Sequence, residues 1–124
     1  MNTSLSFVEL TVRDLDAAVA WYREVMGLRE VMRSEANSFA LLSAGPIRLA
    51  LKQGTPISSS VLLAFEVADL DRWVRDLTDR GIPLDGEVKT SREGYRRARV
   101  RDLDGYAVSV FEWLDIGDKV RVTR

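Results

Sequence analysis

Two decamers decide the fold, FVELTVRDLD (Phe7 to Asp16) and LLAFEVADLD (Leu62 to Asp71). Both end in Val-x-Asp-Leu-Asp, and both join an alternation of apolar residues to a helix start. Alternation with a period of two is typical of a half-buried strand, and Asp is a preferred residue at a helix N-terminus. A pattern that starts at residue 7 and again at residue 62 predicts two copies of one supersecondary unit.

Both copies continue in the same way. Apolar residues recur at helical spacing and a glycine follows them: Leu15, Val19, Tyr22 and Met26 before Gly27, and Leu70, Val74 and Leu77 before Gly81. Three strand candidates follow each helix, at residues 28–34, 37–43 and 47–53, and at residues 87–90, 95–101 and 106–113.

The sequence therefore predicts an α+β fold of two tandem βαβββ modules, about 5–53 and 61–114, in one domain that spans residues 1–124. One module has too small a sheet to bury its own apolar face, so we expect the pair to share a cavity. The tail 115–124 has too few apolar residues to decide between an edge strand and disorder.

Composition excludes several functions. Eighteen Lys and Arg against 19 Asp and Glu give a net charge of −1, which disfavours a nucleic-acid partner. No apolar run is long enough to span a membrane, and the first residues do not resemble a secretory signal, so we expect a cytoplasmic protein. The chain has no Cys and no His, so it lacks thiol chemistry, the commonest general base and the commonest metal ligand.

Three stretches resemble the vicinal oxygen chelate superfamily, the glyoxalase/bleomycin-resistance/extradiol-dioxygenase group. They are FVELTVRDLDAAVAWYREVMGL, FEVADLDRWVRDLTDRGI and RVRDLDGYAVSVFEW. In the last stretch Leu103 replaces the Pro of the usual Asp-Pro-Asp-Gly turn. The resemblance implies a cup-shaped mixed sheet with a central cavity. It implies no single function, because the superfamily contains metalloenzymes, isomerases and antibiotic-binding resistance proteins.

The resemblance also identifies the positions where metalloenzymes of the superfamily carry His and Glu ligands. Here they are Phe7, Ala50, Leu62 and Ser109. Divalent cations need three or four lone-pair donors, which this set does not provide. Glu9 and Glu66 could add two carboxylates, a weak site at best. We therefore expect no metal and no cofactor.

Strand alternation assigns the residues that face the expected inter-module cavity. Glu9 is the ionisable candidate, with a tentative catalytic role, and the expected ligand-binding residues are Phe7, Thr11, Arg48, Ala50, Leu62, Ala64, Ser109 and Phe111, with Trp113 as a possible addition. Such an apolar and aromatic lining is typical of sites for small organic molecules. The alternative is that these side chains fill the cavity themselves.

Two functions follow from this lining. The first is a metal-independent protein of the bleomycin-resistance type that binds a small, largely apolar or aromatic molecule. The alternative is a metal-independent isomerase, lyase or cyclase with Glu9 as general base, although Glu9 could equally be a solvated rim residue. We expect a homodimer, because short strands leave exposed sheet edges.

Arg97, Arg99 and Arg101 alternate along one strand candidate. They could form a basic wall for an anionic ligand or the solvated face of an edge strand. The sequence alone favours the solvated face.

Overall fold

The structure is a computed structural model in which residues 2–114 are described. The tail 115–124, for which the sequence left a strand and disorder open, lies outside the described residues. Residues 2–114 contain no helix that is long and apolar enough to cross a membrane.

The chain divides into two compact units. The first comprises residues 1–60 with the turn Asp102–Gly105, and the second comprises residues 61–101 with the chain from Tyr106 onward. The structure groups that turn with the first unit.

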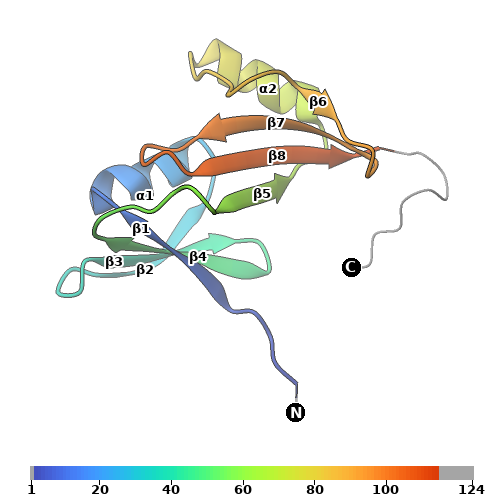
Figure 1. Cartoon of the computed structure of the whole chain (residues 1–124). Helices are drawn as coiled ribbons and strands as arrows, with labels where there is room; N and C mark the ends of the chain where they lie inside the picture. Colours follow the sequence, from blue (N-terminus) through green and yellow to red (C-terminus); the bar gives the residue numbers. More distant parts are fainter. Residues whose placement is uncertain (1, 115–124) are drawn as a thin grey trace. The chain divides into compact units, whose positions relative to one another are not determined.

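The first unit follows the predicted βαβββ order (Figure 1). Its elements are β1 (Phe7–Val12), α1 (Leu15–Glu24), β2 (Arg29–Ser34), β3 (Phe39–Ala44) and β4 (Ile47–Gln53). The sheet has the order β1-β4-β3-β2, with β1 parallel to β4 and the other pairs antiparallel.

The second unit repeats this arrangement. It contains β5 (Leu62–Glu66), α2 (Leu70–Asp79), β6 (Lys89–Thr90), β7 (Tyr95–Arg101) and β8 (Ala107–Trp113). The sheet order is β5-β8-β7-β6, again with one parallel pair, β5 with β8. The tandem βαβββ prediction is therefore confirmed, and β6 covers only half of the predicted 87–90.

Both helices begin where the repeat predicts. Asp14 accepts a hydrogen bond from the backbone N of Ala17, and Asp69 accepts one from the backbone N of Arg72, each at 3.1 Å. Gly27 follows α1 with a φ of 71°, a conformation that favours glycine. Met26, predicted as the last residue of the helical stripe, lies beyond the end of α1.

The core of each unit lies between its helix and one face of its sheet. In the first unit Leu15, Val19 and Tyr22 of α1 are buried, together with Leu10, Val12, Ala40, Leu42, Leu49 and Leu51 of the sheet. In the second unit Leu70 and Leu77 of α2 are buried, together with Ala98, Val100, Val108 and Val110. Because side chains alternate along a strand, the intervening residues face away from the helix in each sheet.

The turn Asp102–Gly105 is fixed within the first unit by hydrogen bonds. The hydroxyl of Tyr22 donates to Oδ2 of Asp102 at 2.6 Å, and both side chains are buried. The backbone N of Arg13 donates to Oδ1 of Asp104 at 3.0 Å. A buried carboxylate needs such donors because burial removes it from water.

Candidate functional site

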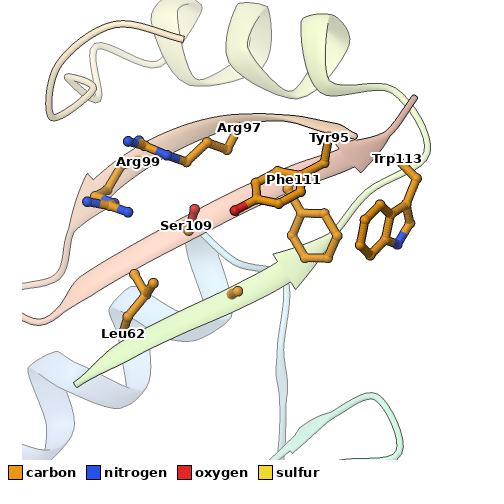
Figure 2. Close-up of a pocket in the computed structure, with 8 residues that line it drawn as sticks. Leu62, Tyr95, Arg97, Arg99, Ser109, Phe111 and Trp113 are labelled. Atoms are coloured by element: carbon orange, nitrogen blue, oxygen red, sulfur yellow. The ribbon is translucent and has the colours of Figure 1, made fainter. Parts of the chain in front are cut away.

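The second unit has a pocket on the sheet face opposite α2 (Figure 2). Its volume is about 200 Å³, and its lining residues come from β5, β7 and β8: Leu62, Ala64, Tyr95, Arg97, Arg99, Ser109, Phe111 and Trp113. The register explains why these residues meet. Ser109 of β8 lies opposite Ala64 of β5 on one side and opposite Arg99 of β7 on the other, so all three side chains face the same way.

Three aromatic rings form one end of the pocket. Tyr95 and Trp113 are directly opposed on β7 and β8, with ring centroids 5.7 Å apart. Phe111 lies 5.5 Å from Tyr95 and 5.3 Å from Trp113, and all three pairs have edge-to-face geometry. This arrangement stabilises the cluster and gives the pocket a rigid aromatic wall.

The other end of the pocket is polar and cationic. Figure 2 shows the side chains of Arg97 and Arg99 extending toward this end, where Ser109 also lies, while Phe111 and Trp113 lie toward the opposite end. The Tyr95 ring comes from the aromatic side, with its hydroxyl toward Ser109. Hydroxyl and guanidinium groups are hydrogen-bond donors, so this end can bind an acceptor.

The residues of this unit that the sequence predicted for the site all line this pocket. Leu62, Ala64, Ser109 and Phe111 were assigned to the ligand site from strand alternation, and all four line it. Ser109 is buried, whereas Leu62 is 52% exposed. Their role as ligand-binding residues stays a prediction.

The predicted residues of the first unit share the sheet face that points away from α1. The parallel register places Phe7 opposite Arg48 and Glu9 opposite Ala50, and Thr11 follows on the same face. Phe7 is 47% exposed and Ala50 is fully buried. Glu9 is exposed. In the pocket of the second unit the ionisable side chains are Tyr95, Arg97 and Arg99.

Sequence reasoning missed Arg97 and Arg99 as site residues. The alternation of arginines was the available signal, but the solvated face of an edge strand was favoured. The edge-strand part of that interpretation is wrong, because β7 lies between β8 and β6. A solvated side chain does describe Arg101, which is 52% exposed and paired with Asp85. Arg97 and Arg99 are only partly exposed and line the pocket, which favours the basic-wall interpretation for these two residues.

The residues at the superfamily's metal-ligand positions do not fit a divalent cation. Phe7, Ala50 and Leu62 have no side-chain donor atom, and Ser109 offers a single hydroxyl. In the described part of the chain, no three His, Cys, Asp or Glu side chains are grouped so that they could hold a metal ion.

Comparisons with known proteins agree with this fold. The chain is similar to a lactoylglutathione lyase from Agrobacterium tumefaciens, with 23% identity, a TM-score of 0.74, and coverage of 90% of this chain and 94% of that one. A glyoxalase/bleomycin resistance protein/dioxygenase from Nocardioides gives 20% identity and a TM-score of 0.78, covering 99% and 91% of the two chains.

TioX from Micromonospora sp. ML1 gives 27% identity and a TM-score of 0.73, covering 90% of this chain and 100% of that one. A search of curated protein sequences gave no match. The family model described as Glyoxalase/Bleomycin resistance protein/Dioxygenase superfamily matches residues 4–110, which is most of the chain. This protein therefore belongs to the glyoxalase/bleomycin resistance protein/dioxygenase superfamily.

Proposed function

We propose that this protein binds a small aromatic molecule in the pocket of its second unit, without a metal, as a binding protein of the bleomycin-resistance type. The observation that carries the proposal is the aromatic wall of Tyr95, Phe111 and Trp113 around a pocket of about 200 Å³. Mostly apolar concave sites with a few convergent polar groups are typical of small-molecule binding.

The size of the pocket suits a ligand of about one or two fused rings. An apolar cavity of about 150 Å³ in another protein holds benzene. The pocket here has a volume of about 200 Å³ and an open side, so it accommodates a ring system with one substituent. Leu62 and Ala64 add aliphatic contacts on the β5 side.

A metal-free site is consistent with the side chains present. The four ligand positions of the superfamily's metalloenzymes carry residues that cannot form a metal site here. Elemental analysis of protein purified without a chelator tests this part of the proposal, and about one equivalent of Zn, Ni, Fe or Mn per chain would refute it.

Calorimetric titration with three naphthalene derivatives of different charge, 2-naphthoate, 2-naphthamide and 2-naphthylmethylamine, tests the binding itself. We expect at least one of them to bind, and we expect Phe111→Ala to weaken that binding by about tenfold because it removes an aromatic contact. Phe39→Ala, which changes a partly buried Phe of the first unit, is the matched control. The proposal fails if none of the three binds, or if Phe111→Ala binds as well as the unmodified protein.

A further inference from the structure

Strand β7 carries four arginines, and the structure divides them by their partners. Arg96 pairs with Asp71 at 3.1 Å, and Arg101 pairs with Asp85 at 2.8 Å. The hydrogen bond from Arg96 to Asp71 raises the pKa of Arg96. Within residues 2–114, neither Arg97 nor Arg99 has an ion-pair partner, and these two are the arginines that line the pocket.

Arg99 is the more constrained of the two. Its Nε is buried and has no hydrogen-bond partner among the described residues. A buried donor on a charged group is costly when no acceptor compensates for its lost hydration. Buried polar atoms without partners are rare in native proteins, so each one calls for a physical explanation.

The surroundings of these arginines are positive. Arg97 and Arg99 are two residues apart on one strand, so their side chains lie on the same face. Lys89 of β6 is directly opposite Arg97 and adds a third cation to that face. Glu66 of β5 is on this face too, in the same cross-strand row as Arg97 with Phe111 between them, and it does not line the pocket.

An anionic group at the polar end of the pocket would have the guanidinium groups of Arg97 and Arg99 as partners. We infer that the pocket selects small aromatic molecules that carry an oxyanion, either a carboxylate or a phosphate, and that Arg97 and Arg99 bind this group. The inference rests on the proposed function and specifies the charge of the ligand, which that proposal leaves open. The rings of such a molecule lie against Phe111 and Trp113, and its oxyanion lies toward Ser109.

The choice of arginine strengthens this assignment. The guanidinium is a planar fork whose parallel N–H groups match the two oxygens of a carboxylate or phosphate. Its delocalised positive charge attracts an anion and is less strongly hydrated than the ammonium of a lysine. Apolar walls around the group lower the local dielectric and so strengthen the attraction to an anion.

Matched ligands provide the test. Calorimetric titration of the unmodified protein compares 2-naphthoate with 2-naphthamide, which has the same shape and no charge, and with 2-naphthyl phosphate. We expect 2-naphthoate or 2-naphthyl phosphate to bind at least about tenfold more tightly than the amide, because hydrogen bonds to charged groups are stronger than neutral ones. Tighter binding of the phosphate indicates a phosphate ester as the ligand class, and tighter binding of 2-naphthoate indicates a carboxylic acid.

Arginine variants then assign the effect to residues. Arg97→Gln and Arg99→Gln are each expected to remove most of the preference for the anion and to leave the affinity for 2-naphthamide unchanged. Arg75→Gln, an equal change of charge at an exposed position of α2, is the control and keeps the preference. If a Gln variant lacks a cooperative thermal transition, the corresponding Arg→Lys variant replaces it, and we expect it to bind the anion more weakly because Lys lacks the fork.

Failure of the inference differs from failure of the proposed function. If 2-naphthoate, 2-naphthyl phosphate and the amide bind equally well, or if the arginine variants keep the preference, the inference is wrong while aromatic binding stands. If none of the naphthalene ligands binds, both the proposed function and the inference are overturned.

Discussion

Arg99 and Ser109 lie directly opposite each other on β7 and β8, and both line the pocket of the second unit. Ser109 is the position where metalloenzymes similar to this chain carry a glutamate ligand. A carboxylate there would lie next to the Arg99 guanidinium and neutralise it. The serine leaves the charge of Arg99 available to a ligand.

Ser109→Asp should therefore abolish the preference for 2-naphthoate over 2-naphthamide, because the new carboxylate competes for Arg99 and repels an anionic ligand. Ser109→Asn is the matched control, since the Asn side chain is about as large as that of Asp and carries no charge. We expect Asn to change the ratio of the two dissociation constants by less than about threefold, because it adds no charge beside Arg99. A calorimetric ratio unchanged in the Asp variant would contradict the assignment.

Ligand binding should alter the fluorescence of Trp113 and not that of the other two tryptophans. Trp113 lines the pocket, whereas Trp21 and Trp73 lie on α1 and α2. An aromatic ligand in contact with an indole ring quenches its emission. Titration with 2-naphthyl phosphate should give a quenching signal that disappears in Trp113→Phe and persists in Trp73→Phe. Loss of the signal in the Trp73 variant instead would place the ligand elsewhere.

The general-base alternative makes a different prediction about pH. The chain has no histidine, and arginine does not titrate near neutrality, so binding of 2-naphthoate should be constant from about pH 6 to pH 9. Glu9→Gln, a nearly isosteric change at an exposed position, should leave this binding unchanged. A loss of binding in Glu9→Gln would assign Glu9 to the ligand site, and a loss of turnover of any substrate would support the enzyme alternative.

Much of the fold could be predicted because it depends on local patterns. Alternation predicted β1 and β5, and the paired Asp residues predicted where α1 and α2 begin. Met26 continued the helical spacing, yet α1 ends before it, because the left-handed Gly27 follows at once. The spacing of apolar residues does not show at which residue the backbone leaves the helical conformation.

The candidate site was only half predictable for a physical reason. Leu62, Ala64, Ser109 and Phe111 follow from strand alternation alone. Arg97 and Arg99 alternate along the strand in the same way as solvated arginines do. Whether such an arginine is available to a ligand depends on which carboxylates of other elements lie next to it. Asp71 and Asp85 pair with Arg96 and Arg101 and leave the other two arginines without partners among the described residues, which no local pattern reveals.

The buried hydrogen bond from Tyr22 to Asp102 should stabilise the first unit. Tyr22→Phe removes the donor and leaves a buried carboxylate less satisfied, so the free energy of unfolding should fall by about 1–3 kcal/mol. Tyr95→Phe removes a hydroxyl from the open pocket, and it should change the free energy of unfolding by less than about 0.5 kcal/mol. Urea denaturation measures both, and equal stability of Tyr22→Phe and the unmodified protein would contradict a stabilising role.

A homodimer remains our expectation for the assembly. In the described part of the chain, β1 and β2 form the edges of one sheet, and β5 and β6 form the edges of the other. Val31 and Met32 are exposed on β2, at 40% and 48%. Sedimentation equilibrium at micromolar concentration should give twice the 14.0 kDa mass of one chain, and a single species of 14.0 kDa would refute the dimer.

The most direct test of the central claim is a crystal structure of the protein with 2-naphthoate. The account predicts the rings against Phe111 and Trp113, and the carboxylate about 2.7–2.9 Å from guanidinium nitrogens of Arg97 and Arg99. A ligand bound outside this pocket, or bound in it with the carboxylate directed away from both arginines, would contradict the account.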